Sequence, residues 1–145
     1  MTKCIGLTFV FFALNLALAQ QVMTPKDIVI GYMETVVNNQ QIDDIDTFIS
    51  PNLIQHNPNL PNGLEPLRNF WMGFFVDVPE ANFRIVRVIA ENSLVAVHSH
   101  FTPVPDALGL AVVDIFRVED GLIVEHWDVS MEIPAETASG NSVTD

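Results

Sequence analysis

The sequence predicts an α+β domain in which three N-terminal helices cover one face of a curved antiparallel sheet. Between residues 24 and 37, apolar side chains recur at the spacing of an amphipathic helix. From Ala81 onward the apolar period changes to two, which is typical of strands whose side chains alternate between two faces. Helices followed by a run of strands indicate this class, and 145 residues correspond to one domain.

The first nineteen residues have the composition of a secretory signal peptide. Lys3 precedes an apolar run from Ile5 to Ala19, which ends on Ala17-Leu18-Ala19 before two glutamines. A charged start, an apolar middle and an A-x-A site are typical of such signals, and the run is shorter than the roughly 20 residues that span a bilayer. We predict a signal peptide at residues 1–19, cleavage after Ala19, and a secreted or periplasmic protein without stable membrane association. An uncleaved membrane anchor is the alternative.

The remainder of the chain is acidic and lacks cysteine, because Cys4 is the only one. Without residues 1–19, five Lys or Arg stand against 18 Asp or Glu, which gives a formal net charge of −13. Such a chain is repelled by nucleic acid and by anionic membrane surfaces, so we expect neither as a partner. Since no disulfide can form, the core alone must hold the fold.

The first helix is well marked at its start. Thr24 is the expected N-cap, Pro25 suits the first helical position, and Asp27 lies near the positive end of the helix dipole. We expect one face of this helix to pack in the core, since apolar stripes of this kind are usually packing surfaces. That stripe comprises Ile28, Val29, Tyr32, Met33, Val36 and Val37.

A second, short helix is expected from Asp43 to Ile49, and a third after Gly63. Residues 52–63 contain two prolines and several asparagines, which predicts a short strand followed by a shaped loop that holds His56. The third helix carries a set of large side chains that must be buried, namely Leu67, Phe70, Trp71, Phe74 and Phe75.

Four strands then follow in a meander. They are expected at residues 83–89, 94–102, 109–118 and 122–131. The last residues, 135–145, are small and polar, and we expect them to be disordered.

An aspartate in the third of these strands is the first candidate for chemistry. Asp114 lies in the apolar run Leu110-Ala-Val-Val-Asp-Ile-Phe. A buried carboxylate loses its hydration, so it needs a partner or a raised pKa, and both are typical of proton-transfer sites. On the preceding strand, His98 and His100 share one face because strand residues alternate.

The last hairpin allows two registers. A two-residue turn at residues 120–121 pairs Asp114 with Trp127, whereas a three-residue loop at residues 119–121 with a bulge pairs Asp114 with His126. We predict the second register, because it joins apolar residues to apolar residues. It also gives the buried carboxylate a partner.

These residues resemble the SnoaL-like polyketide cyclases of the nuclear-transport-factor-2-like (NTF2-like) superfamily. The resemblance rests on His100, on Asp114 within VVDIFRVEDG, on LIVEHWDV after it, and on the earlier QHNPNLPNG. It covers roughly Thr24 to Pro134 and implies a SnoaL-like domain at residues 20–134. The implied fold is a cone-shaped α+β barrel with a pocket inside the curved sheet, often paired as a homodimer.

The resemblance also implies a reaction. Cyclases of this family close rings by intramolecular aldol chemistry without a cofactor, and an aspartate acts as acid and base. That role maps onto Asp114, with His100 as its polar companion. The substrate is a small molecule that the resemblance does not name.

Three functions are consistent with these residues. In the first, an aldol-type cyclisation or an isomerisation, Asp114 takes a proton next to a carbonyl while a histidine or Trp127 hydrogen-bonds the enolate oxygen. In the second, His98, His100 and His126 hold a metal. In the third, the protein binds a small apolar ligand without turnover.

We expect further residues to line the pocket in which such a compound binds. These are His56, His98, His126, Trp127, Tyr32 and Trp71. The alternative for Asp114 and His126 is a buried hydrogen-bonded pair with a packing role only.

Overall fold

The computed structural model describes residues 23–145, and the predicted signal peptide lies outside this range. The first described helix, α1 (Pro25–Tyr32), begins at the predicted cap. The Thr24 hydroxyl accepts a hydrogen bond from the Asp27 backbone N–H (3.2 Å), and the Asp27 carboxylate accepts one from the Thr24 backbone N–H (2.9 Å). This reciprocal pair satisfies backbone donors that the first helical turn leaves open.

The apolar stripe of the first helix lies in the core as predicted, although the helix changes its geometry after Tyr32. It continues as a π-helix, η1 (Met33–Asn38), and a 3₁₀-helix, η2 (Ile42–Thr47), follows where the short helix is expected. All six residues of the stripe are buried. No helix within residues 23–145 is both long and apolar enough to cross a membrane.

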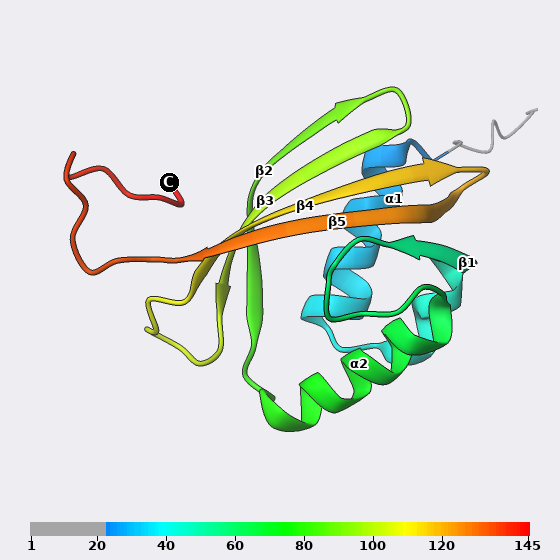
Figure 1. Ribbon diagram of the computed structural model, residues 1–145, viewed down its shortest axis with the longest axis horizontal. Coiled ribbons are helices and arrows are strands. Elements are labelled where there is room, and N and C mark those ends of the chain that lie inside the picture. Colours follow the sequence, from blue (N-terminus) through cyan, green and yellow to red (C-terminus); the bar gives the residue numbers. More distant parts are fainter. Residues whose placement is uncertain (1–22) are drawn as a thin grey trace, which may run out of the picture.

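Five strands form one curved sheet, and α1 and α2 (Leu64–Asp77) lie on the same side of it (Figure 1). In sheet order the strands are β1 (Ile49–Gln55), β5 (Leu122–Glu132), β4 (Leu110–Glu119), β3 (Leu94–Thr102) and β2 (Asn82–Glu91). The α+β class and the curved sheet are therefore confirmed.

Two details of the sheet differ from the predicted antiparallel barrel. β1 pairs with β5 in parallel, so the sheet is mixed, and it does not close into a barrel. A parallel pair needs a long crossover connection, and α2 and three strands separate β1 from β5 along the chain.

The core lies between this side of the sheet and the helices. Trp71 of α2 stacks on Phe75 and meets Phe74 and Phe83 edge-on, with ring centroids 5.4, 5.4 and 6.0 Å away. Of the large side chains expected to be buried in the third helix, Leu67 and Trp71 are buried and Phe74 and Phe75 are partly buried. The expectation is wrong for Phe70, which is 39% exposed. The largest fully buried apolar residues are Ile45, Ile49, Leu53, Ile123, Val29, Val36, Val95 and Val97.

The predicted register of the last hairpin is wrong. The turn is the two-residue turn at Asp120 and Gly121, because both residues adopt the positive φ (50° and 84°) that such a turn requires. A bulge then slips the register by one residue, so Asp114 lies opposite Asp128 and not opposite His126. Because His126 is two residues from Asp128 on the same strand, Asp114 and His126 still share a face of the sheet.

Beyond β5 the chain turns back on the sheet without forming a helix or strand. Arg84 of β2 donates a hydrogen bond to the backbone oxygen of Thr144 (3.3 Å), and Arg87 donates one to that of Asp145. The end of the chain therefore lies against β2, on the face away from the helices. The disorder expected for residues 135–145 stays a prediction.

Gly109 is needed where the loop after β3 enters β4. Its φ is +67°, and a Cβ atom there would lie 1.9 Å from the backbone oxygen of Phe101. We therefore expect Gly109→Ala to lower the free energy of unfolding by on the order of 1–3 kcal/mol or more, because the backbone must shift and adopt a strained φ. Urea denaturation followed by circular dichroism measures this.

Gly73, in the middle of α2, provides the matched control. A Cβ atom there meets nothing within 4 Å, so Gly73→Ala should raise the free energy of unfolding by about 0.5–1 kcal/mol through helix propensity. Equal effects of the two substitutions would contradict the close approach at Gly109.

Candidate active site

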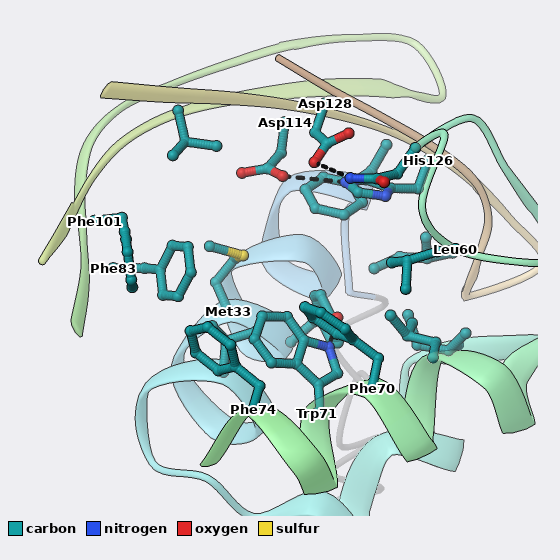
Figure 2. Close-up of a pocket in the computed structure, with 18 of the residues that line it drawn as sticks. Met33, Leu60, Phe70, Trp71, Phe74, Phe83, Phe101, Asp114, His126 and Asp128 are labelled. Atoms are coloured by element: carbon teal, nitrogen blue, oxygen red, sulfur yellow. Dashed lines mark hydrogen bonds and ion pairs between the residues drawn. The ribbon is translucent and has the colours of Figure 1, made fainter. Parts of the chain in front are cut away.

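A cavity of about 200 Å³ lies between the inner face of the sheet and the helices. Figure 2 shows the acidic and imidazole groups of β4 and β5 on its sheet side and the aromatic rings of α2 on the opposite side. Its aromatic walls are formed by Phe70, Trp71, Phe74, Phe83, Phe101 and Phe116. Its polar lining residues are Tyr32, Asn57, Asp114, His126, Asp128 and Ser130.

Asp114 and His126 form the central pair of this site. Asp114 is only 9% exposed, and its Oδ1 lies 3.1 Å from His126 Nε2. No described residue hydrogen-bonds the other carboxyl oxygen, which points away from His126 (Figure 2). Burial raises the pKa of the Asp114 carboxyl; the hydrogen bond and charge of His126 lower it, and the charge of Asp128 adds to the rise.

The other side of the His126 ring is held by β1. Its Nδ1 lies 2.9 Å from Oε1 of Gln55, and the same oxygen accepts a hydrogen bond from the backbone N–H of Asn57 (2.9 Å). The ring also stacks on Phe116, with centroids 4.8 Å apart and planes 21° apart. His126 is therefore fixed both in its plane and at its two nitrogens.

The loop after β1 supplies a further polar group. Asn57 donates a hydrogen bond from its amide to Asp128 Oδ2 (2.7 Å), and the backbone N–H of His56 donates one to the backbone oxygen of His126 (2.9 Å). The loop is thus attached to β5 at the level of the central pair. Asp128 is the second carboxyl group of the cavity.

Two buried aromatic residues add a hydrogen-bonding group on the helix side. The indole N–H of Trp71 donates to the Tyr32 hydroxyl (2.8 Å), and burial, with a contribution from the Asp114 charge, raises the pKa of Tyr32 well above its ordinary range. The hydroxyl therefore stays protonated. Because its oxygen already accepts from Trp71, its own proton can be donated to a group in the cavity.

A family model described as a SnoaL-like domain matches residues 29–126. This segment contains most of the fold and all but two of the polar lining residues. The chain belongs to the SnoaL-like family. No curated protein sequence matches this SnoaL-like chain.

Solved structures show the same fold. A SnoaL-like polyketide cyclase from Agrobacterium tumefaciens is 19% identical, covering 76% of this chain and 93% of that one with a TM-score of 0.65. TsrD from Streptomyces laurentii is 22% identical, with 74% and 91% coverage and a TM-score of 0.61. An NTF2-like protein of unknown function from Cytophaga hutchinsonii is 13% identical, with 77% and 94% coverage and a TM-score of 0.65. At these identities the likeness shows that this SnoaL-like chain has the NTF2-like fold.

In the SnoaL-like domain, His98 and His100 lie on the sheet face opposite the cavity. On β3 it is Val97 that pairs with Asp114 on the inner face, so the neighbouring even-numbered residues point outward. His100 Nε2 lies 2.8 Å from the backbone oxygen of Leu108. The expected partnership of His100 with Asp114 is therefore not formed, and His126 takes its place.

The same alternation separates the three histidines of the metal hypothesis. His126 faces the cavity while His98 and His100 face outward, and residues 23–145 contain no group of three or more His, Cys, Asp or Glu placed to hold a metal. For His98, burial and the charge of Arg87 lower its pKa.

His56 and Trp127 also lie outside the cavity, on the outer face of β5. Their rings stack with centroids 4.7 Å apart and planes 3° apart, and His56 Nε2 lies 2.9 Å from Glu125 Oε1. Arg117 donates a hydrogen bond to the other Glu125 oxygen (2.8 Å). The hydrogen bond from Arg117 lowers the pKa of Glu125 most, and that from His56 lowers it further. Of the pocket residues expected from the sequence, Tyr32, Trp71 and His126 line the cavity.

Three residues of the site are not among those expected from the sequence. Asp128 follows His126 by two positions, so strand alternation alone places it on the same face. Gln55 and Asn57 belong to the stretch QHNPNLPNG, which carries part of the family resemblance. Their contacts with β5 span 71 positions of sequence, and no local pattern indicates them.

Proposed function

We propose that this SnoaL-like protein is an enzyme of the cyclase type, which uses Asp114 with His126 to move protons on a small neutral carbonyl compound. The reaction is an aldol-type cyclisation or an isomerisation. One observation carries the proposal: a buried carboxyl group, hydrogen-bonded to an imidazole at one oxygen, presents its other oxygen to an apolar cavity. The solved cyclase from Agrobacterium tumefaciens supports the class of reaction.

The pair can both take and return a proton. When the proton between Oδ1 and Nε2 resides on His126, Asp114 is ionised, and its free oxygen accepts a proton from the carbon next to a carbonyl. The C–H electron pair moves to the carbonyl oxygen, where the Tyr32 hydroxyl is a candidate donor. In a cyclisation, the enolate carbon attacks a second carbonyl, and the proton on Asp114 is returned to the new alkoxide.

The cavity selects for uncharged compounds. No Lys or Arg is among its described lining residues, and two carboxyl groups, Asp114 and Asp128, face it. An anionic ligand would be repelled and left without a partner. An apolar cavity of about 150 Å³ admits benzene, so about 200 Å³ suits a compound of one or two rings.

Solvent deuterium exchange tests this function with simple ketones in place of the natural substrate. Neutral aryl ketones and β-ketoesters are incubated in D₂O with the protein, and loss of the α-proton signal is followed by NMR. We expect exchange faster than in buffer for compounds that fit the cavity. Saturable binding of these compounds without any exchange would instead support a binding protein.

We also propose that the chain is exported, on the basis of the composition of its first nineteen residues. When the full chain is expressed in a secreting host, the intact mass of the exported product should correspond to a chain that begins at Gln20. A product that retains Met1 would contradict this.

We further propose a homodimer formed through the outer face of the sheet. This face presents exposed apolar side chains from four adjacent strands, namely Ile89, Leu94, Ile115, Val129 and Met131. Exposed apolar side chains on one face of a sheet are typical of an interface. Sedimentation of the protein and of Val129→Glu should give a dimer for the first and a monomer for the second.

A further inference from the structure

The hydrogen bonds around His126 determine which of its nitrogens carries a proton. Gln55 Oε1 accepts from the backbone N–H of Asn57, and a backbone N–H can only donate. This contact fixes the orientation of the Gln55 amide, so the atom that faces His126 Nδ1 at 2.9 Å is an oxygen. Because that oxygen can only accept, Nδ1 must carry a proton.

A protonated Nδ1 restricts what Asp114 and His126 can share. In a neutral imidazole with its proton on Nδ1, the Nε2 atom has only a lone pair, and it faces Asp114 Oδ1 at 3.1 Å. Two lone pairs would repel each other at this distance. A proton must therefore lie between Oδ1 and Nε2, on one atom or on the other.

We propose that Gln55 is a positioning residue that holds the proton of His126 on Nδ1 and thereby keeps one exchangeable proton between His126 and Asp114. Without this acceptor, a neutral His126 would place its single proton on Nε2 against an ionised Asp114, and the pair would hold one proton fewer. The catalytic meaning of this inference rests on the proposed function, whereas the tautomer follows from the hydrogen bonds alone.

The surroundings of Gln55 support a role for its oxygen. Within the described structure, its amide nitrogen is buried and has no hydrogen-bond partner. A buried donor without a partner destabilises a fold. An amide at this position, despite its unpaired nitrogen, is consistent with a requirement for its Oε1 atom as an acceptor for His126.

Few other groups influence the titration of this pair. Besides Asp114 and His126 themselves, the titratable residues that line the cavity are Tyr32 from α1 and Asp128 from β5. The cavity-lining residues of α2, β2 and β3 carry no titratable side chain. The effect of a substitution at Gln55 on the protonation of this pair is therefore overlaid by few other titratable groups.

NMR of protein labelled with ¹⁵N in histidine tests the inference directly, since protonated and unprotonated ring nitrogens resonate in separate ranges. The His126 signals are assigned with His126→Gln. In the unsubstituted protein, we expect Nδ1 to stay protonated across the pH range in which the fold is retained. In Gln55→Leu, we expect the neutral ring to carry its proton on Nε2, and the pair to hold one proton fewer.

Two further variants separate this effect from general disruption of the loop. Gln55→Glu restores an acceptor and should return the proton to Nδ1. Asn62→Ala removes the side chain whose Oδ1 accepts from the Gln55 backbone N–H (2.8 Å) but leaves the Gln55 amide in place, so the His126 spectrum should not change.

The inference is overturned if neutral His126 of the unsubstituted protein carries its proton on Nε2, or if Gln55→Leu leaves tautomer and titration unchanged. If Gln55→Leu does not fold, the spectra of the unsubstituted protein and of Gln55→Glu decide the question. Absence of α-proton exchange together with the expected tautomer would remove the proposed function and leave this inference standing.

Discussion

Asp114→Asn is expected to reduce α-proton exchange by roughly 10²- to 10⁴-fold, the contribution typical of a general acid or base. The new amide matches the carboxyl group in shape, and its N–H can donate to the lone pair of His126 Nε2. We therefore expect the variant to fold with the same cavity and to bind the same ketones. Exchange is measured by NMR in D₂O, and binding by calorimetry.

The same substitution should stabilise the fold relative to the unsubstituted protein, and this difference should grow as the pH rises. The pKa of Asp114 is raised in the fold above its ordinary value of 3.8 because the group is buried. As pH rises above about 3.8, the unfolded chain releases this proton while the folded chain retains it, so stability falls until the raised pKa is passed. Asp114→Asn lacks this loss, and its advantage in urea denaturation should grow from acidic to neutral pH.

Asp43→Asn serves as the matched control, because Asp43 is an exposed carboxylate of η2 outside the cavity. It should leave α-proton exchange unchanged. Full exchange activity in Asp114→Asn would remove Asp114 from the chemistry. Stability curves that run parallel to those of the unsubstituted protein would contradict a buried group with a raised pKa.

Trp71→Ala is expected to lower the free energy of unfolding by about 3–5 kcal/mol. The Trp71 side chain is almost wholly buried among the rings of Phe74, Phe75 and Phe83. Its removal leaves a void that these rings cannot fill, and it deprives the Tyr32 hydroxyl of its donor. Urea denaturation followed by far-ultraviolet circular dichroism measures the loss.

Trp71→Phe separates packing from hydrogen bonding. It keeps an aromatic ring in the cluster and loses the indole N–H, so its effect should be smaller, on the order of 1–2 kcal/mol. A loss below about 1 kcal/mol in Trp71→Ala would show that the aromatic cluster contributes little to the core.

The order and type of the elements could be predicted because each carries a local signal. The capping residues mark the start of α1, and the period of two marks the strands, of which β3 matches its predicted bounds (Leu94–Thr102). The register of the last hairpin could not be predicted in the same way. The sequence allows a two-residue and a three-residue loop, and it does not indicate the register shift between Arg117 and Val118 that places Asp114 opposite Asp128.

The site is harder to predict than the fold. Residues of a strand alternate between two faces, but this alternation does not say whether the odd- or the even-numbered residues face the core. On β3, apolar residues occur in both sets, so the pattern does not decide whether His98 and His100 or Val97 and Ser99 face the core. The structure buries Val97 and Ser99 completely. For Asp114, by contrast, burial follows from apolar neighbours on both sides in sequence.

The parallel pairing of β1 with β5 places Gln55 beside His126, and these strands lie on either side of α2 and the whole β2–β4 meander in the sequence. Pairs that are so distant along a chain carry a large entropic penalty for loop closure and tend to form late in folding. A fragment that contains only the β4–β5 hairpin would thus keep Asp114 and His126 but have no means of setting the imidazole proton. The protein would then catalyse proton transfer only once the whole chain is folded, and partly folded molecules would be inactive.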